Sequence, residues 1–298
     1  MDSYSDFALV YDTFMDETPY SEWADYISQL ISKYGISKPK KSGPVLEKED
    51  SDQDSSNKDV SNDVSNDVSE EEMLSQERDL IVELGCGTGS FAEEMASRGY
   101  DIMGIDNSQQ MLQIAINKKD KSGHDIMYLE QDMREFELFC TAGTFLSVCD
   151  SVNYLTEVQD VVKMLKLVNN YLYPDGIIIF DFNTLHKYRD VIGDTTIAED
   201  REDCAFIWDN WFDSDTSINE YDLTIFVHEG DNRYRKFNET HFQRGYTLDE
   251  MLSIVKESGM EFVKAIDADT HEDPDEDSER ICIIARKNSE NNTRVTEE

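Results

Sequence analysis

The feature that most constrains the fold is a repeated alternation of short apolar strands, glycine-containing turns and amphipathic helices, which begins at Asp79. This alternation is typical of a parallel sheet whose strands are joined by crossover helices. Strands are predicted at Leu80 to Leu84, Ile102 to Asp106, Met127 to Gln131, Thr144 to Cys149, Gly176 to Phe182, Glu261 to Ala265 and Arg280 to Arg286. We therefore predict a doubly wound α/β sheet of seven strands in a domain that spans residues 79–288.

The period of the apolar residues changes to two between about residues 204 and 246. Three segments alternate apolar and polar side chains there, namely AFIWDNWFD, INEYDLTIFVHE and RYRKFNETHFQRGY, and Asp, Ser and Gly-Asp-Asn turns separate them. This pattern predicts three antiparallel strands inserted into the α/β domain.

Two regions of different character precede the domain. Apolar residues recur at spacings of three and four from Asp6 to Tyr34, which predicts two short helices and a helical cap over residues 1–36. Residues 37–78 are rich in Asp, Glu, Ser and Asn, and a DVSN tetrapeptide repeats among them, so we predict an acidic disordered insertion. An acidic docking segment is the alternative there. Residues 289–298 are predicted to form a polar tail.

The charge of the chain limits its partners. Lys and Arg number 27 against 65 Asp and Glu, a net charge of −38 that disfavours nucleic acid and anionic membranes. Apolar runs are far shorter than the roughly 20 residues of a membrane helix, and the N-terminus lacks a signal peptide's pattern. We expect a cytoplasmic protein. The five scattered cysteines form no C-x-x-C pair, so neither disulfides nor a metal site is predicted. The sequence leaves the oligomeric state open.

The strongest motif is ELGCGTG at Glu83 to Gly89, where an apolar strand ends and a helix begins. Its alternating glycines let the backbone approach a ligand closely at a helix N-terminus. A dinucleotide fingerprint reads G-x-G-x-x-G/A, but Ser90 takes its last position, so a nicotinamide or flavin cofactor is the weaker interpretation. The acidic, alternating-glycine form resembles the first motif of the class I S-adenosylmethionine-dependent methyltransferases. The resemblance implies a Rossmann-like fold and a cofactor site at Glu83, Gly85, Cys86, Gly87 and Gly89.

Later segments fit the same resemblance. Asp106 ends the second strand, 21 residues after Gly85, where a carboxylate can accept hydrogen bonds from a ribose diol; a helix-capping Asp is the alternative. The resemblance implies further cofactor contacts from Asn107, Met111, Gln131, Asp132, Met133, Cys149 and Asp150, with the methionines against the adenine and the last two residues facing the methyl group. The loop at Cys149 to Tyr154 disfavours two other reactions. Adenine and glutamine amide methylases carry Pro-Pro where this chain has Ser151 and Val152, and methylation of cytosine carbon would need a Pro-Cys nucleophile, but Cys149 follows Val148.

The N-terminal helices carry Phe-x-x-x-Tyr-Asp and Tyr-x-x-Trp, which resemble a pattern of small bacterial methyltransferases that include sugar N-methyltransferase-like members. Tyr11 and Trp23 are therefore expected to face the sulfonium cation, although these rings could simply hold the cap on the core. We also predict that Tyr11, Asn153, His241 and Arg244 converge on an acceptor pocket. His241 would accept a proton and Arg244 would hold an anionic group. The alternatives are a solvated strand face or a dimer interface.

The resemblance implies transfer of a methyl group from S-adenosylmethionine to a nitrogen or oxygen of a small-molecule acceptor. Two other functions stay open. One is methylation of a macromolecule, and the other is a non-catalytic cofactor-binding or interaction protein.

Overall fold

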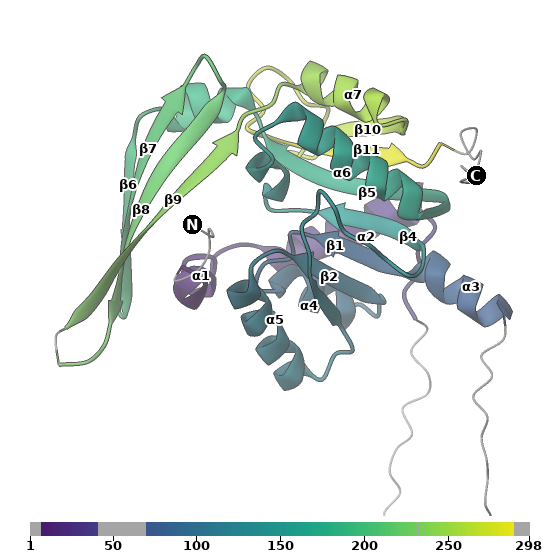
Figure 1. Ribbon diagram of the computed structural model, residues 1–298, viewed down its shortest axis with the longest axis horizontal. Helices are drawn as coiled ribbons and strands as arrows, with labels where there is room; N and C mark the ends of the chain where they lie inside the picture. The colour runs from purple at the N-terminus through teal and green to yellow at the C-terminus, as the bar shows by residue number, and fades with distance from the viewer. Residues whose placement is uncertain (1–6, 41–69, 232, 289–298) are drawn as a thin grey trace, which may run out of the picture.

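The computed structural model describes residues 7–40, 70–231 and 233–288. Seven strands form the main sheet in the order β10-β11-β5-β4-β1-β2-β3 (Figure 1). They are β1 (Ile81–Leu84), β2 (Ile102–Asp106), β3 (Met127–Glu130), β4 (Ala142–Ser147), β5 (Leu172–Asn183), β10 (Glu261–Asp267) and β11 (Arg280–Arg286). Strands β1 to β5 are parallel, and β11 runs antiparallel to both β5 and β10. The predicted seven-stranded, Rossmann-like sheet is confirmed.

Helices cover both faces of this sheet. The helices of the described residues are α1 (Ala8–Phe14), α2 (Tyr20–Tyr34), α3 (Glu70–Asp79), α4 (Ser90–Ser97), α5 (Gln109–Ser122), α6 (Val158–Tyr171) and α7 (Leu248–Glu257), with short helical turns η1 (Ser151–Tyr154) and η2 (Lys187–Ile192). Buried side chains of α6 and α7, such as Leu165 and Ile254, form one core with the sheet. Those of α2 and α4, such as Ile31 and Met95, form the core on the opposite face. In the described ranges, no helix is both long and apolar enough to cross a membrane.

The inserted antiparallel sheet has four strands rather than the three predicted. They are β6 (Thr196–Asp200), β7 (Cys204–Asp213), β8 (Ile218–His228) and β9 (Tyr234–Arg244), in that spatial order, and the sheet projects to one side of the main sheet (Figure 1). The additional strand, β6, is a short edge strand whose side chains are mostly exposed. Its polar sequence, TIAED, lacks the run of alternating apolar residues that marks the other three strands.

The two N-terminal helices do not form one cap. Helix α2 packs into the core of the main domain. Helix α1 lies between the antiparallel sheet and α5 (Figure 1). Val10 packs with Phe206 and Ile225 of that sheet, and the Asp12 carboxylate lies 2.7 Å from Lys118 Nζ on α5. Helix α1 therefore bridges the antiparallel sheet and α5.

The predicted disordered insertion is wrong at both ends. The Ser37 side chain is buried and its hydroxyl lies 2.8 Å from that of Thr144 on β4. Helix α3 occupies most of the C-terminal end of the predicted segment and packs beside β4. The Glu77 carboxylate accepts a hydrogen bond from the Thr141 hydroxyl at 2.5 Å. Residues 41–69 and the predicted polar tail lie outside the described residues.

Candidate active site

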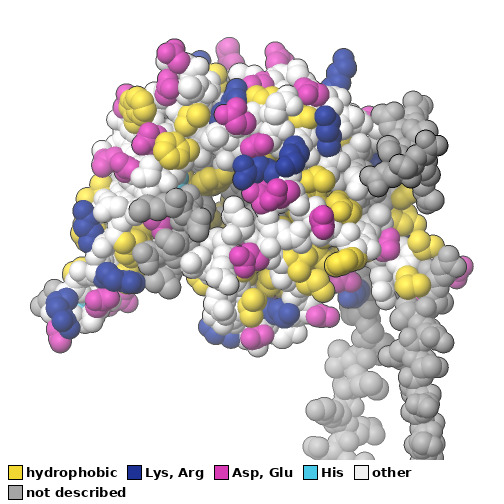
Figure 2. All heavy atoms as spheres, in the orientation of Figure 1, with side chains coloured by type: hydrophobic (Ala, Val, Ile, Leu, Met, Phe, Trp, Pro, Cys, Tyr) yellow, Lys and Arg dark blue, Asp and Glu magenta, His cyan; other side chains and the backbone are white. Residues whose placement is uncertain are grey.

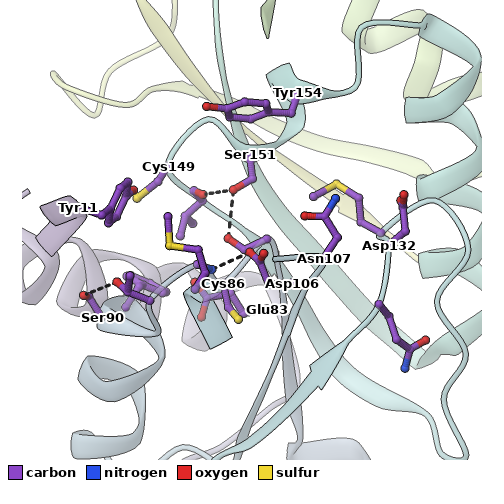
Figure 3. Close-up of a pocket in the computed structure, with 18 of the residues that line it drawn as sticks. Tyr11, Glu83, Cys86, Ser90, Asp106, Asn107, Asp132, Cys149, Ser151 and Tyr154 are labelled. Atoms are coloured by element: carbon purple, nitrogen blue, oxygen red, sulfur yellow. Dashed lines mark hydrogen bonds between the residues drawn. The ribbon is translucent and has the colours of Figure 1, made fainter. Parts of the chain in front are cut away.

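The glycine loop after β1 forms one wall of a cavity of about 360 Å³ at the carboxyl ends of the parallel strands (Figure 3). Gly85 and Gly87 have φ of 71° and 52°, a left-handed conformation that favours glycine. A β-carbon at Gly85 would collide with Ser151, whereas one at Gly87 would meet no atom within 4 Å. Since Gly87 also lines the cavity, a side chain there would occupy space that a ligand would use.

Asp106 at the end of β2 holds this loop in place. Its Oδ2 accepts a hydrogen bond from the Gly87 N–H and its Oδ1 accepts one from the Ser108 N–H, both at 2.8 Å. Burial raises the pKa of this carboxyl, and the backbone hydrogen bonds oppose that rise. Asp106 lines the cavity, and each oxygen retains lone-pair capacity for a ligand hydroxyl.

Glu83 is a buried acid with unmet hydrogen-bonding capacity. Its side chain lines the cavity, and Oε2 has no hydrogen-bond partner among the described residues. Burial, reinforced by the nearby charge of Asp106, raises the pKa of Glu83 to about 8. A buried carboxyl in this position suits a cationic ligand group, because a positive charge nearby would stabilise the ionised carboxylate and lower its pKa. S-adenosylmethionine carries an ammonium and a sulfonium, so the residues present fit that cofactor.

Polar and apolar side chains meet on the β2 and β3 side of the cavity. Met111 and Met133 supply apolar surface, and Asp132 lies beside them. Asp132 accepts a hydrogen bond from Arg134 at 2.5 Å, which lowers the pKa of its carboxyl. Arg134 also lies 3.2 Å from Asp160. Because two carboxylates already neutralise it, Arg134 is a poor binding group for an anion.

The loop after β4 closes the cavity from above the glycine loop (Figure 3). Cys149 and Asp150 both have positive φ, 59° and 53°, which is uncommon for residues other than glycine. Their N–H groups donate to the buried Asp181 carboxylate at 3.1 and 2.7 Å. Asp181 therefore holds this unusual backbone shape. The Cys149 side chain lines the cavity, whereas Asp150 Oδ2 accepts hydrogen bonds from Gln243 and Asn183 instead.

Most of the predicted cofactor-binding residues line this cavity. They are Tyr11, Glu83, Gly85, Cys86, Gly87, Asp106, Asn107, Met111, Gln131, Asp132, Met133 and Cys149. Asp150, Gly89 and Trp23 do not. Gly89 has φ of 73°, and a β-carbon there would run into Tyr128 and Ala115, so helix packing explains this glycine. Trp23 packs against the Arg280 guanidinium, 4.4 Å from its ring centre, which matches the structural alternative for this aromatic residue.

The structure does not bring the four predicted acceptor residues together. Tyr11 lines the cavity. Asn153 is fully buried, and its amide donates to the carbonyls of Asn183 and Arg244 at 2.9 and 2.7 Å, so it fastens η1 to the ends of β5 and β9. The Arg244 side chain pairs with Glu250 at 2.7 Å, outside the cavity lining. His241 is 1% exposed and lies behind the cavity wall, in contact with Tyr154.

Sequence reasoning missed several residues that line the cavity, namely Tyr20, Thr88, Ser90, Phe91, Arg134, Val148, Ser151, Tyr154 and Leu155. Most are neighbours of predicted residues in the same loops. Tyr20 opens the Tyr-x-x-Trp motif, and Tyr154 ends the loop that was expected to face the methyl group. The sequence located these loops but did not show which of their side chains point into the cavity.

Comparisons with known proteins show the family of this chain. A family model described as a methyltransferase domain matches residues 81–176, which run from β1 into β5. The chain belongs to the class I S-adenosylmethionine-dependent methyltransferases, as the glycine motif indicated, and it is a methyltransferase. It is 31% identical over 287 residues to "Putative methyltransferase YqeM" of Bacillus subtilis (strain 168), an alignment that covers 95% of this chain and 97% of that protein.

Solved structures share the fold. One is an S-adenosylmethionine-dependent methyltransferase from Clostridium acetobutylicum ATCC 824, with a TM-score of 0.74 and 22% identity over 96% of this chain and 99% of that chain. Another is the sugar N-methyltransferase KedS8 from Streptoalloteichus sp ATCC 53650, with a TM-score of 0.58 and 13% identity over 70% of this chain and 79% of that one. At these identities the likeness concerns the fold.

Proposed function

We propose that this protein transfers a methyl group from S-adenosylmethionine to a nitrogen or oxygen atom of a small-molecule acceptor. The observation that carries the proposal is the cavity at the carboxyl end of β1, where the glycine loop faces the same space as the buried Glu83 carboxyl, whose Oε2 has no hydrogen-bond partner in the described part of the chain. In open α/β sheets, ligands bind at this edge.

When bound, the cofactor supplies a methyl group on a positively charged sulfur. The residues of this chain bind and orient it. Glu83 and Asp106 offer carboxylates to its cationic and hydroxyl groups, and Met111 and Met133 offer apolar surface to its base. The rings of Tyr11 and Tyr20 lie at the wall formed by the N-terminal helices and suit a cation. Enclosure by these groups positions the reactants and excludes water.

Two features favour a small acceptor. Helix α1 and the loop after β4 both contribute to the cavity lining, so the space beside the cofactor site is bounded by the protein itself. On the face drawn in Figure 2, lysine and arginine side chains lie among aspartates and glutamates. Such mixed charge is unlike the basic surface that nucleic acid requires. The cytoplasmic location stays a prediction from sequence.

A metabolite screen tests this function. The purified protein is incubated with S-adenosylmethionine labelled in the methyl group and with fractionated small metabolites, and labelled products are identified by mass spectrometry. We expect the label in one class of small nitrogen or oxygen compound. Label found only in protein or RNA fractions would contradict a small-molecule acceptor, and cofactor binding with no transfer to any fraction would favour a non-catalytic role.

A further inference from the structure

Buried polar side chains form a chain of contacts behind the cavity wall, on the inner face of the antiparallel sheet. Tyr154 lines the cavity (Figure 3), and its hydroxyl lies 2.7 Å from the Tyr221 hydroxyl and 3.3 Å from His241 Nδ1. His241 Nε2 lies 3.3 Å from Glu239 Oε2. The imidazole also stacks on the Tyr221 ring, with centroids 5.0 Å apart. The contacts therefore lead from the cavity to a buried carboxylate.

The direction of the hydrogen bonds follows from the chemistry of each group. Glu239 is 9% exposed, and its Oε1 accepts a hydrogen bond from the Phe7 N–H at 2.9 Å, so the start of α1 fixes this carboxylate. The negative charge of an ionised Glu239, whose Oε2 lies 3.3 Å from Nε2, favours the tautomer that carries its proton on Nε2, and in that tautomer Nδ1 is the acceptor. Tyr154 then donates to Nδ1 and accepts from the Tyr221 hydroxyl, 2.7 Å away, and the second lone pair of the Tyr154 oxygen faces the proton of an acceptor in the cavity.

The cofactor site does not explain this arrangement. The carboxyl groups that line the cavity belong to other elements, since Glu83 lies on β1, Asp106 ends β2 and Asp132 follows β3. All five histidines lie in the described part of the chain, and none of them lines the cavity. Tyr154 therefore links the cavity to the imidazole of His241. Methyl transfer to an amine or a hydroxyl releases one proton, which must be taken up.

We propose that Tyr154, His241 and Glu239 form a proton relay for an acceptor that is an amine or a hydroxyl compound without an anionic group. This inference rests on the proposed function. The acceptor proton moves to the Tyr154 oxygen as the proton of Tyr154 moves to His241 Nδ1. The electron pair released on the acceptor atom forms the new bond to the methyl carbon, and the electrons of the broken carbon–sulfur bond stay on sulfur. The positive charge lost by sulfur ends on the imidazolium, beside Glu239.

The charges around the cavity support this acceptor class. Arg134, the cationic side chain among the described lining residues, is paired with Asp132 and Asp160. Arg244, which sequence reasoning assigned to an anionic acceptor, is paired with Glu250. The relay thus accounts for the proton that leaves the acceptor, whereas no described side chain at the cavity wall offers an unpaired positive charge to an anion.

Histidine nitrogen NMR tests the relay without knowledge of the acceptor. The full chain is labelled with ¹⁵N-histidine, saturated with S-adenosylhomocysteine and studied at pH 8, with His241 assigned from the His241→Gln variant. We expect the tautomer with a proton on Nε2 and an accepting Nδ1. Tyr154→Phe should shift the Nδ1 resonance, and Glu239→Gln should change the tautomer population. The matched control is Tyr188→Phe, which removes a buried hydroxyl bonded to Gln243 and should leave the His241 signals unchanged.

The outcomes separate the two proposals. A proton on Nδ1 in the parent protein, or a Tyr154→Phe variant with an unmoved Nδ1 resonance, would overturn the relay even if S-adenosylhomocysteine binds. Failure of the parent protein to bind that compound would instead contradict the proposed function. With an acceptor from the metabolite screen, Tyr154→Phe and His241→Gln should lower kcat roughly 100-fold or more, with cofactor affinity retained. An undiminished kcat in either variant would also overturn the relay.

Discussion

At the scale of single residues, Asp106 combines two roles that one substitution can measure. It accepts hydrogen bonds from the Gly87 and Ser108 N–H groups and also lines the cavity. Asp106→Ala should weaken the binding of S-adenosylhomocysteine by about 1–3 kcal/mol, because hydrogen bonds to a charged acceptor are lost. Asp132→Asn should cost less, since its amide keeps an acceptor oxygen. Calorimetry measures both, and parent-like affinity in Asp106→Ala would refute the assigned role.

Glu83 should make stability depend on pH. Its pKa of about 8 in the folded protein lies above the ordinary value of 4.5, so protonation favours the folded state. This contribution is fully present below about pH 4.5 and is lost as the pH rises toward 8. The Tm and the free energy of unfolding of the ligand-free protein should therefore fall over that range. Glu83→Gln should reduce the fall in the free energy of unfolding by on the order of 1 kcal/mol or more. Glu135→Gln, which makes the same change at an exposed side chain, serves as the control. An identical pH profile in Glu83→Gln would contradict the assignment.

The motif could locate the cofactor site but could not orient every side chain in it. Alternating glycines directly after an apolar strand place backbone near a ligand, which holds for Gly85 and Gly87. Gly89 has the same spacing but is required by packing against Tyr128. Trp23 and Asn153 likewise turn toward Arg280 and Asn183. Those orientations depend on contacts between distant segments, which a single sequence does not reveal.

At the scale of elements, α3 and the segment before it should respond differently to deletion. Helix α3 packs on β4 and holds Thr141 through Glu77. Residues 44–66 are acidic and lack aromatic side chains, and a long loop costs little closure entropy. Replacing 44–66 by a short Gly-Ser linker should leave Tm and cofactor affinity almost unchanged. Extending the deletion through residue 79 should lower Tm clearly. A large loss of Tm from the shorter deletion would show that residues 44–66 are structural.

The predicted helices and strands match the structure where apolar residues recur with a clear period. They differ where contacts with other elements determine whether a segment is ordered or where it packs. The buried strands of the main sheet and the three long strands of the insertion have clear patterns. Strand β6 and helix α3 are polar sequences that become ordered because β7 and β4 lie beside them. Helix α2 has the amphipathic pattern of a cap, yet it packs into the main core. Contacts with neighbouring elements, which the apolar period of a single segment does not reveal, decided all three.

At the scale of the whole molecule, the doubly wound sheet was predictable because alternating strands and helices favour parallel strands joined by crossover helices. The position of the antiparallel sheet was not. Its inner face holds α1 through Val10 and supports Tyr154 through Tyr221 and His241. Acceptor chemistry in this fold depends on such inserted parts, so the proposed acceptor side of the site could not be placed from the sequence.

The most direct test of the account is calorimetric titration of S-adenosylmethionine into the parent protein and two glycine variants. Gly87 and Gly123 both have positive φ, and a β-carbon at either would meet no atom within 4 Å, but only Gly87 lines the cavity. Gly87→Val and Gly123→Val should therefore bear similar backbone strain. We predict one cofactor site in the parent and in Gly123→Val, and no binding in a folded Gly87→Val. Equal affinity in Gly87→Val, or no binding by the parent, would contradict the account.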